Sequence, residues 1–98
     1  MNIAERNDLL RASIPCISKP NALLLTRGIY DKFNDDDVAK IMAKVKTFNN
    51  FTTDNDPWKE HDFGSFEHNG VKIFWKIDDY AGAEGLQLVL TILLAEEY

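Results

Sequence analysis

The chain is poor in sulfur and imidazole, with a single cysteine, Cys16, and two histidines among its 98 residues. One cysteine cannot form an internal disulfide, and these counts exclude a structural zinc site of four cysteines or of two cysteines and two histidines. A cysteine hydrolase would need Cys16 beside a histidine, and no sequence motif brings them together. The sequence therefore predicts a fold held by its own core.

Long apolar runs are also absent. No run reaches the roughly 18 residues of a membrane-span candidate, and the N-terminal MNIAERNDLLRAS has charges where a signal peptide needs an apolar core. The hydrophobic content of 45% and charged content of 28% are typical of a globular protein. We expect one domain, residues 1–98, in the cytoplasm and away from membranes.

Basic residues are outnumbered, with 11 Lys and Arg against 16 Asp and Glu and a net charge of −5. Phosphate backbones attract clustered Lys and Arg, so direct binding of nucleic acid is disfavoured. An acidic surface suits a basic protein partner, including one that normally holds nucleic acid. Acidity is equally a common route to solubility.

The first half of the chain predicts two helices around one strand. Residues 2–12 form the first helix, with Asn2 and Glu5 at the spacing of a capping box. ALLLTRG, residues 22–28, predicts a buried strand followed by a turn. Residues 35–48 form the second helix, because acidic residues precede lysines and an apolar stripe recurs every three or four residues.

The second half predicts a β-meander. Asn69-Gly70 is a strong signal for a two-residue hairpin, because a type I′ turn needs positive φ at both positions. The register then pairs His68 with Val71, Glu67 with Lys72, Phe66 with Ile73 and Gly64 with Trp75. A flexible loop is expected at 81–86 and a strand at 87–97, with a helix as its alternative. The predicted class is α+β, a small antiparallel sheet with helices on one face.

Four motifs, LLTRGI, FNNFTTDNDPWKEHDFGSF, FWKIDDY and LTILLAEEY, together resemble a bacterial family of small proteins of unknown function. The resemblance spans residues 23–98, and IAERNDLLR is similar too. The chain departs from the family where AGAEGLQ replaces a longer insert with Ser, Pro and Asp. The resemblance implies a place on plasmids and other mobile elements, and it carries over no activity.

NDPWKEHDFG, residues 55–64, lies in the part of the chain that looks least like scaffold. The candidate binding residues are Asp54, Asp56, Trp58, Glu60, His61, Asp62 and, outside this stretch, Arg27. Counted from Asp54, the segment DNDPWKEHDFG fits an EF-hand loop poorly, since Trp58 stands at the fifth position and no glycine stands at the sixth. His61 could serve as a general base, yet no nucleophile accompanies it. We therefore expect no metal, no cofactor and no catalytic residue.

The structural alternative for this stretch is a rigid connector between a helix and a strand. Its carboxylates are then expected to pair with Arg27, and Trp58 is expected to tuck onto the sheet rather than to serve as an interface anchor. His68, beside the hairpin turn, is expected to be solvated.

These observations favour a small acidic protein-binding module without catalysis. Given the mobile-element context, its concrete form is an inhibitor of a host defence system such as CRISPR or restriction. The first alternative is a metal-dependent hydrolase or nuclease that uses residues 54–62, and the second is a structural or antitoxin-like partner protein. The sequence does not indicate an oligomeric state.

Overall fold

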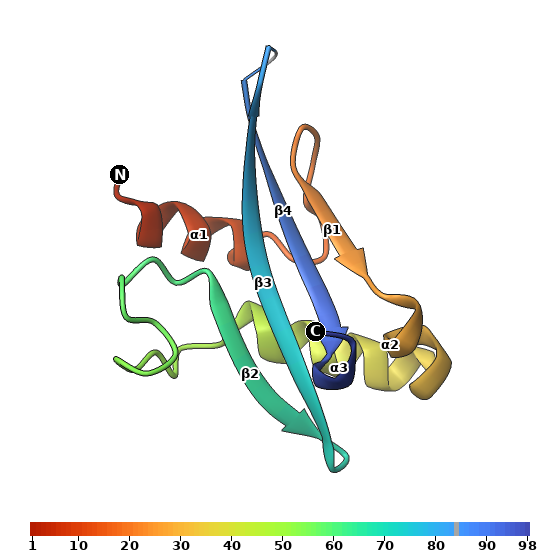
Figure 1. The fold of residues 1–98 in the computed structure, drawn as a ribbon. Helices are drawn as coiled ribbons and strands as arrows, with labels where there is room; N and C mark the ends of the chain where they lie inside the picture. The colour runs from red at the N-terminus through yellow and green to blue at the C-terminus, as the bar shows by residue number, and fades with distance from the viewer. Residues whose placement is uncertain (84) are drawn as a thin grey trace.

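The computed structural model describes residues 1–83 and 85–98 and has the expected α+β class (Figure 1). The elements in chain order are α1 (Ile3–Ala12), β1 (Ala22–Leu25), α2 (Arg27–Lys32), α3 (Asp35–Lys46), β2 (Phe63–His68), β3 (Val71–Gly82), β4 (Gly85–Leu94) and the 3₁₀ helix η1 (Ala95–Glu97). The four strands form one sheet in the order β1-β4-β3-β2. β1 runs parallel to β4, and the other two pairings are antiparallel.

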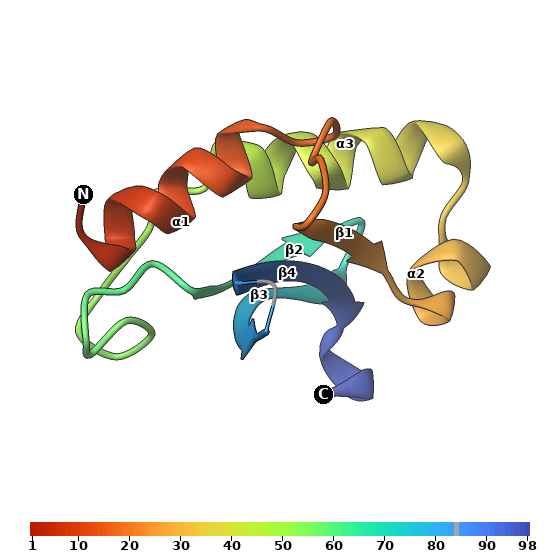
Figure 2. The same ribbon diagram turned by 90° about the horizontal axis from the view of Figure 1, so that it is seen from above.

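The sheet is covered on one side only. Figure 2 shows α1 and α3 above the sheet and, among the described residues, η1 on the opposite side. The core between helices and sheet consists chiefly of Leu10, Ile14, Ile29, Phe33, Val38, Ile41, Val45, Ile73, Trp75, Ile77, Leu88, Leu90, Ile92 and Leu94. The apolar stripe expected on the 35–48 helix, now α3, does face this core.

Both long helices begin as their sequences predict. The Asn2 side chain accepts a hydrogen bond from Glu5 N and completes a capping box, which starts α1. Asn34 caps α3 by accepting from Asp37 N at 2.9 Å, and three aspartates occupy the first turn. Caps of this kind satisfy amide groups that the first turn leaves free, so local sequence is enough to place them.

The predicted hairpin is confirmed with its register. Asn69 and Gly70 have φ of 51° and 77°, as the tight turn requires. All four predicted pairs occur between β2 and β3. The alternation of the strand then turns Ile73, Trp75 and Ile77 toward the helices, where all three are buried.

Three expectations need correction. The segment 81–86, expected as a flexible loop, is mostly strand, because β3 and β4 pair as far as Gly82 and Gly85. Glu84, within this segment, lies outside the described residues. The last strand ends at Leu94, and residues 95–97 form η1. The turn expected after the first strand is the start of α2, and the strand itself lies at the sheet edge beside β4.

Glu97 explains why the chain turns as it does around Arg27. Its carboxylate accepts hydrogen bonds from the Thr26 hydroxyl at 2.6 Å, from Leu94 N at 2.9 Å and from Gly28 N at 3.3 Å. These bonds, that of Thr26 foremost, lower the pKa of Glu97. The contact ties η1 to the start of α2 across about 70 residues of sequence, so local patterns could not predict it. No helix in the described part of the chain is long and apolar enough to span a membrane.

Gly64 provides a test of the core packing. A Cβ at this position would collide with the Trp75 indole and would lie 2.8 Å from Phe48 Cε1. Gly64→Ala should therefore lower the free energy of unfolding, measured in urea, by about 1–3 kcal/mol. Gly82→Ala is the matched control, because no atom of the described residues lies within 4 Å of its added Cβ and its φ is not positive. Equal stability of the two variants would contradict the packing.

Candidate functional site

The candidate binding residues, apart from Arg27, lie in the segment that joins α3 to β2. Most of this segment, residues 49–62, is called the 49–62 loop below. In Figure 1 it runs out beside β2, at the end of the sheet where α1 begins. It contains no helix or strand, so its shape depends on side chains that bond to its backbone.

Asp56 organises the loop from inside. The residue is buried, and its Oδ1 accepts hydrogen bonds from Glu60 N at 3.0 Å and from His61 N at 3.1 Å. Lys59 and His61 both have a φ of 54°, a left-handed backbone conformation that residues other than glycine rarely adopt. The Asp56 carboxylate holds this conformation in place, because it binds the two amides that the reversal turns inward.

His61 links the loop to α1. Its Nδ1 lies 2.9 Å from Asp8 Oδ1, and its Nε2 lies 3.6 Å from Asp56 Oδ2. The imidazole ring stacks on Phe51, with 3.9 Å between centroids and 2° between planes. Asn7 adds a second tie, because its Nδ2 donates to Glu60 O at 2.8 Å. His61 is therefore engaged on both nitrogens and on one face.

Arg11 is the buried cation of this region. Its Nη1 donates to the carbonyls of Val45 at 3.1 Å and Phe48 at 2.8 Å, at the C-terminal end of α3. Its Nη2 bonds to Asp8 Oδ1 at 2.6 Å. The guanidinium carbon also lies 5.3 Å from the Phe51 ring centroid and 5.0 Å from that of Trp75. One side chain thus joins α1, α3, the loop and the sheet.

The sequence reasoning missed Asp8 and Arg11. The inward residues of α1 and the turn after it are Asn7, Leu10, Arg11 and Ile14. Their spacing of three, one and three is that of a helix face, but two of the four are polar, so an apolar pattern does not reveal it. The Asp8–Arg11 spacing of i, i+3 is the signal that could have drawn attention to the pair.

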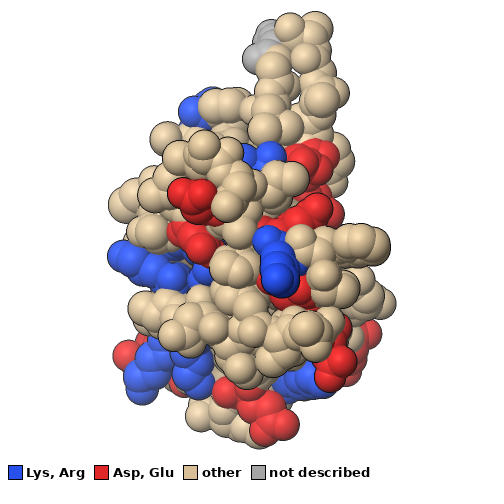
Figure 3. Space-filling view, turned by 90° about the vertical axis from the view of Figure 1, so that its left-hand side faces the viewer, with Lys and Arg blue, Asp and Glu red and all other residues tan. Residues whose placement is uncertain are grey.

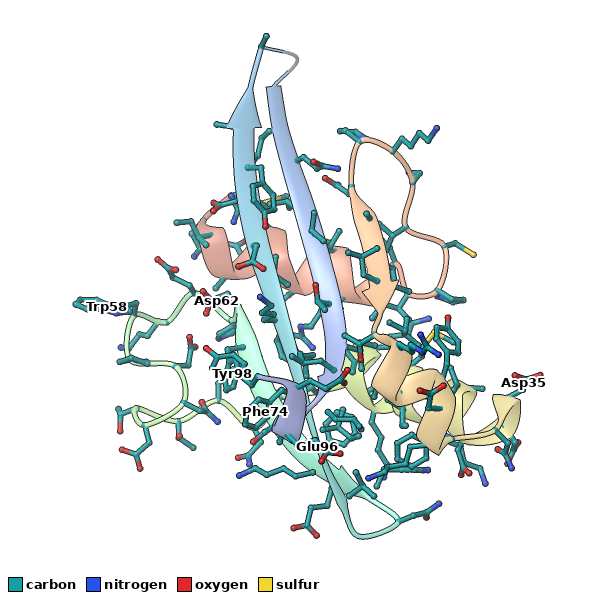
Figure 4. The ribbon with its side chains drawn as sticks, turned by 45° about the vertical axis from the view of Figure 1, so that its right-hand side comes forward. Asp35, Trp58, Asp62, Phe74, Glu96 and Tyr98 are labelled. Carbon is teal, nitrogen blue, oxygen red and sulfur yellow. The ribbon has the colours of Figure 1, made fainter. Side chains whose placement is uncertain are left out.

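Trp58 does not tuck onto the sheet, and that expectation is wrong. The residue is 82% exposed, and Figure 4 shows it at the far end of the 49–62 loop, pointing away from the protein. The backbone reversal at Lys59 and His61 turns the tip outward. Burial of an indole is normally favourable. The interactions that fix the loop therefore keep Trp58 in solvent although its burial against the sheet would lower the free energy.

The expected pairing of Arg27 with the loop is also wrong. Arg27 begins α2, its side chain is 90% exposed, and its ion pair is with Asp31 at 3.6 Å. The reason is topological, since α2 follows β1 at one edge of the sheet and the loop precedes β2 at the other edge. Within the loop, His61 lies beside the Asp56 carboxylate in its place, while Arg11 pairs with Asp8 of α1.

The remaining loop carboxylates differ in their surroundings. Asp54 is exposed, and Glu60 and Asp62 are half-buried. Burial raises the pKa of Asp62, and repulsion by Asp56, Asp78 and Asp79 raises it further. Basic and acidic side chains are interspersed on the side of the protein seen in Figure 3, so the loop does not belong to a uniformly acidic surface.

These acidic groups do not converge on one point. Within the described residues, no group of three or more His, Cys, Asp or Glu side chains is placed to hold a metal ion. Asp56 and His61, the two best candidate ligands of the loop, face backbone amides, Asp8 and each other. The arrangement therefore stabilises a loop conformation.

His68 is not solvated as expected, but buried under α3. Its Nδ1 lies 3.0 Å from Lys44 Nζ and its Nε2 lies 3.0 Å from Asp37 Oδ1, while its ring meets the edge of Phe33. The hydrogen bond with His68 is the main reason that the pKa of Asp37 is lowered. This cluster fixes the β2–β3 hairpin to α3, at the end of β2 opposite to the 49–62 loop.

Arg11 and Arg27 give a matched pair of variants. Arg11→Met keeps the aliphatic stem but removes every donor, so Asp8 and the carbonyls of Val45 and Phe48 each lose a hydrogen bond. The variant should therefore cost about 2–4 kcal/mol of unfolding free energy. Arg27→Ala should cost less than about 0.5 kcal/mol, because exposed ion pairs contribute little. Chemical denaturation measures both values. The opposite order would contradict the assignment of Arg11 as the buried cation.

Asp62 should make stability depend on pH. Its pKa is higher in the folded than in the unfolded chain, so its ionisation weakens the fold as pH rises through that range. Asp62→Asn should therefore raise the melting temperature at pH 7. The gain in free energy of unfolding should stay below about 1 kcal/mol, because water screens the half-exposed group. The gain should vanish below the ordinary pKa of 3.8. Asp54→Asn, in the exposed part of the loop, is the control and should leave the melting temperature unchanged at both pH values.

The comparisons with known proteins give one family. No curated protein and no solved structure matches the chain. Residues 25–97 match the family described as "Protein of unknown function (DUF3768)". The match includes the 49–62 loop and the whole sheet from its last β1 residue onward, whereas α1 with Asp8 and Arg11 lies before it. Because the match covers most of its length, the chain belongs to the DUF3768 family.

Proposed function

We propose that this protein is a binding module that docks on another protein through the tip of the 49–62 loop, with Trp58 as the anchor. One observation carries the proposal: Trp58 is 82% exposed at the end of a loop whose backbone reversal is hydrogen-bonded to the buried Asp56 carboxylate. Tryptophan is enriched among the residues that contribute most to binding when it enters a pocket of the partner.

The rigidity of the loop supports the proposal. A flexible loop loses conformational freedom when it binds, and that loss weakens the complex. Here the reversal at Lys59 and His61 is held by the buried Asp56 carboxylate, and Asn7 anchors the carbonyl of Glu60. The tip is thus arranged before a partner arrives, and unfavourable backbone conformations of this kind are commonly found in binding loops.

The charges of the loop indicate the chemistry of the partner. Between residues 54 and 62 there are four carboxylates and one lysine, Lys59. Burial and nearby carboxylates raise the pKa of Asp62 and so disfavour its charged form, and a cation of the partner would relieve that repulsion. A partner with an apolar pocket rimmed by Lys or Arg fits both features.

The metal-dependent hydrolase is the weaker alternative. Asp56 and His61 would have to leave the contacts that shape the loop in order to bind a metal ion. Docking on a protein, in contrast, leaves Asp56 and His61 in the contacts that they already make. Inhibition of a CRISPR or restriction system stays a prediction. A CRISPR or restriction complex is basic where it holds nucleic acid, and that is the charge that this loop would bind.

The test compares three immobilised baits in an extract of the cells that carry the gene. The wild-type chain and Tyr30→Ala, which changes an exposed aromatic residue of α2, should retain the same protein, and Trp58→Ala should lose it. With the purified partner, calorimetry should show binding by Trp58→Ala weakened at least about 30-fold, or roughly 2 kcal/mol. The melting temperature of Trp58→Ala should equal that of the wild type.

Charge variants separate steering from anchoring. Asp54→Asn and Asp62→Asn should slow association and reduce its dependence on salt, with a smaller effect on dissociation. A partner that binds Trp58→Ala as tightly as the wild type would refute the anchor. Tight binding of calcium, magnesium, manganese or zinc that Asp56→Ala abolishes would instead favour the hydrolase.

A further inference from the structure

The side of the sheet away from α1 and α3, called the outer face, is not the polar surface that a solvated sheet face usually presents. Its strands turn outward Leu24 from β1, Phe63, Ser65 and Glu67 from β2, Lys72, Phe74, Lys76 and Asp78 from β3, and Val89, Thr91 and Leu93 from β4. Of these, only Leu93 is fully buried. Apolar and aromatic residues thus run across all four strands.

An aromatic cluster forms the centre of this face. The rings of Phe63 and Phe74 lie 5.1 Å apart, and Tyr98 packs 5.4 Å from Phe74. Figure 4 shows Phe74 and Tyr98 together on the open side of the sheet, with Glu96 close by. Tyr98 is still 74% exposed and Leu24 is 52% exposed, so the cluster offers apolar area to a second surface.

The charges of the outer face follow an order along β3. The outward residues are Lys72, Phe74, Lys76 and Asp78, so a cation stands at one end and an anion at the other. A two-fold axis across Trp75 that reverses the strand exchanges position 72 with 78 and position 74 with 76. The row is therefore complementary to its own reversed copy, which is what an isologous interface requires.

We propose that two copies of the chain associate through their outer faces, with the β3 strands antiparallel. Lys72 of one copy meets Asp78 of the other, and the Phe74 ring of one meets the Lys76 ammonium of the other. Lys76 and Asp78 bond at 3.2 Å within one copy but remain partly exposed, so Asp78 can accept a second cation. The aromatic clusters meet at the centre.

A second copy fits this face better than the basic partner proposed for the 49–62 loop. On the outer face Lys72 and Lys76 are balanced by Glu67 and Asp78, so this face offers a basic surface no net attraction. The loop, with one lysine among four carboxylates, lies at the β2 edge. Self-association and docking therefore use different residues, and either can fail without the other.

Sedimentation equilibrium of the full chain tests the pairing. The wild type should form dimers, and Lys72→Glu and Asp78→Lys should each weaken dimerisation at least about tenfold, because each sets like charges against each other at both ends. A mixture of these two variants should form a heterodimer, since the introduced glutamate then faces the introduced lysine while the unchanged Asp78 of one chain faces the unchanged Lys72 of the other. Trp58→Ala should dimerise as the wild type does.

Each variant is first shown to be folded by its circular dichroism and its melting curve. A wild type that stays monomeric up to ~1 mM, corresponding to about −4 kcal/mol of association free energy, would overturn the proposal. Dimers that neither charge reversal weakens would overturn it as well. Single variants that become monomeric without forming a heterodimer on mixing would refute the antiparallel β3 pairing.

Discussion

The guanidinium of Arg11 is the interaction on which the loop and its attachment depend. It supplies the C-terminal carbonyls of α3 with donors, holds Asp8 in position for His61 and lies against Phe51 and Trp75. A cation at a helix C-terminus is favourable, but a buried one is costly unless its neighbours are polar or aromatic. This requirement fixes where α1, α3 and the loop can lie relative to one another, and hence where Trp58 points.

Features decided by neighbouring residues were predictable from the sequence. The Asn69-Gly70 turn fixes its register because the two strands are joined by two residues, and the caps at Asn2 and Asn34 act within one helical turn. The α+β class follows from the same local signals. The candidate residues of the loop share one segment because they are neighbours in sequence, but the outward direction of its tip depends on the positive φ of Lys59 and His61, which no local signal indicated.

Features decided by distant residues were not predictable. Arg11 bonds to Val45 and Phe48, which follow it by 34 and 37 positions in the sequence. His61 and Asp8 are 53 positions apart, and Glu97 and Thr26 are 71 positions apart. A polar residue that faces inward looks the same in sequence as one that faces water, which is why Arg27 was taken for the cation of the loop. His68 was misplaced for the same reason, since its partners Asp37 and Lys44 belong to another element.

The two proposed surfaces reinforce each other through geometry. The 49–62 loop leaves the sheet at the β2 edge, whereas the proposed two-fold passes through the outer side of β3. Pairing of the outer faces would therefore leave both Trp58 side chains uncovered. A dimer would present two identical anchors at a fixed separation, and a partner that is itself two-fold or repetitive would then bind the second anchor at a high effective concentration. An isolated loop of this size makes a small interface, so such pairing is the physical means by which a modest single contact becomes a strong one.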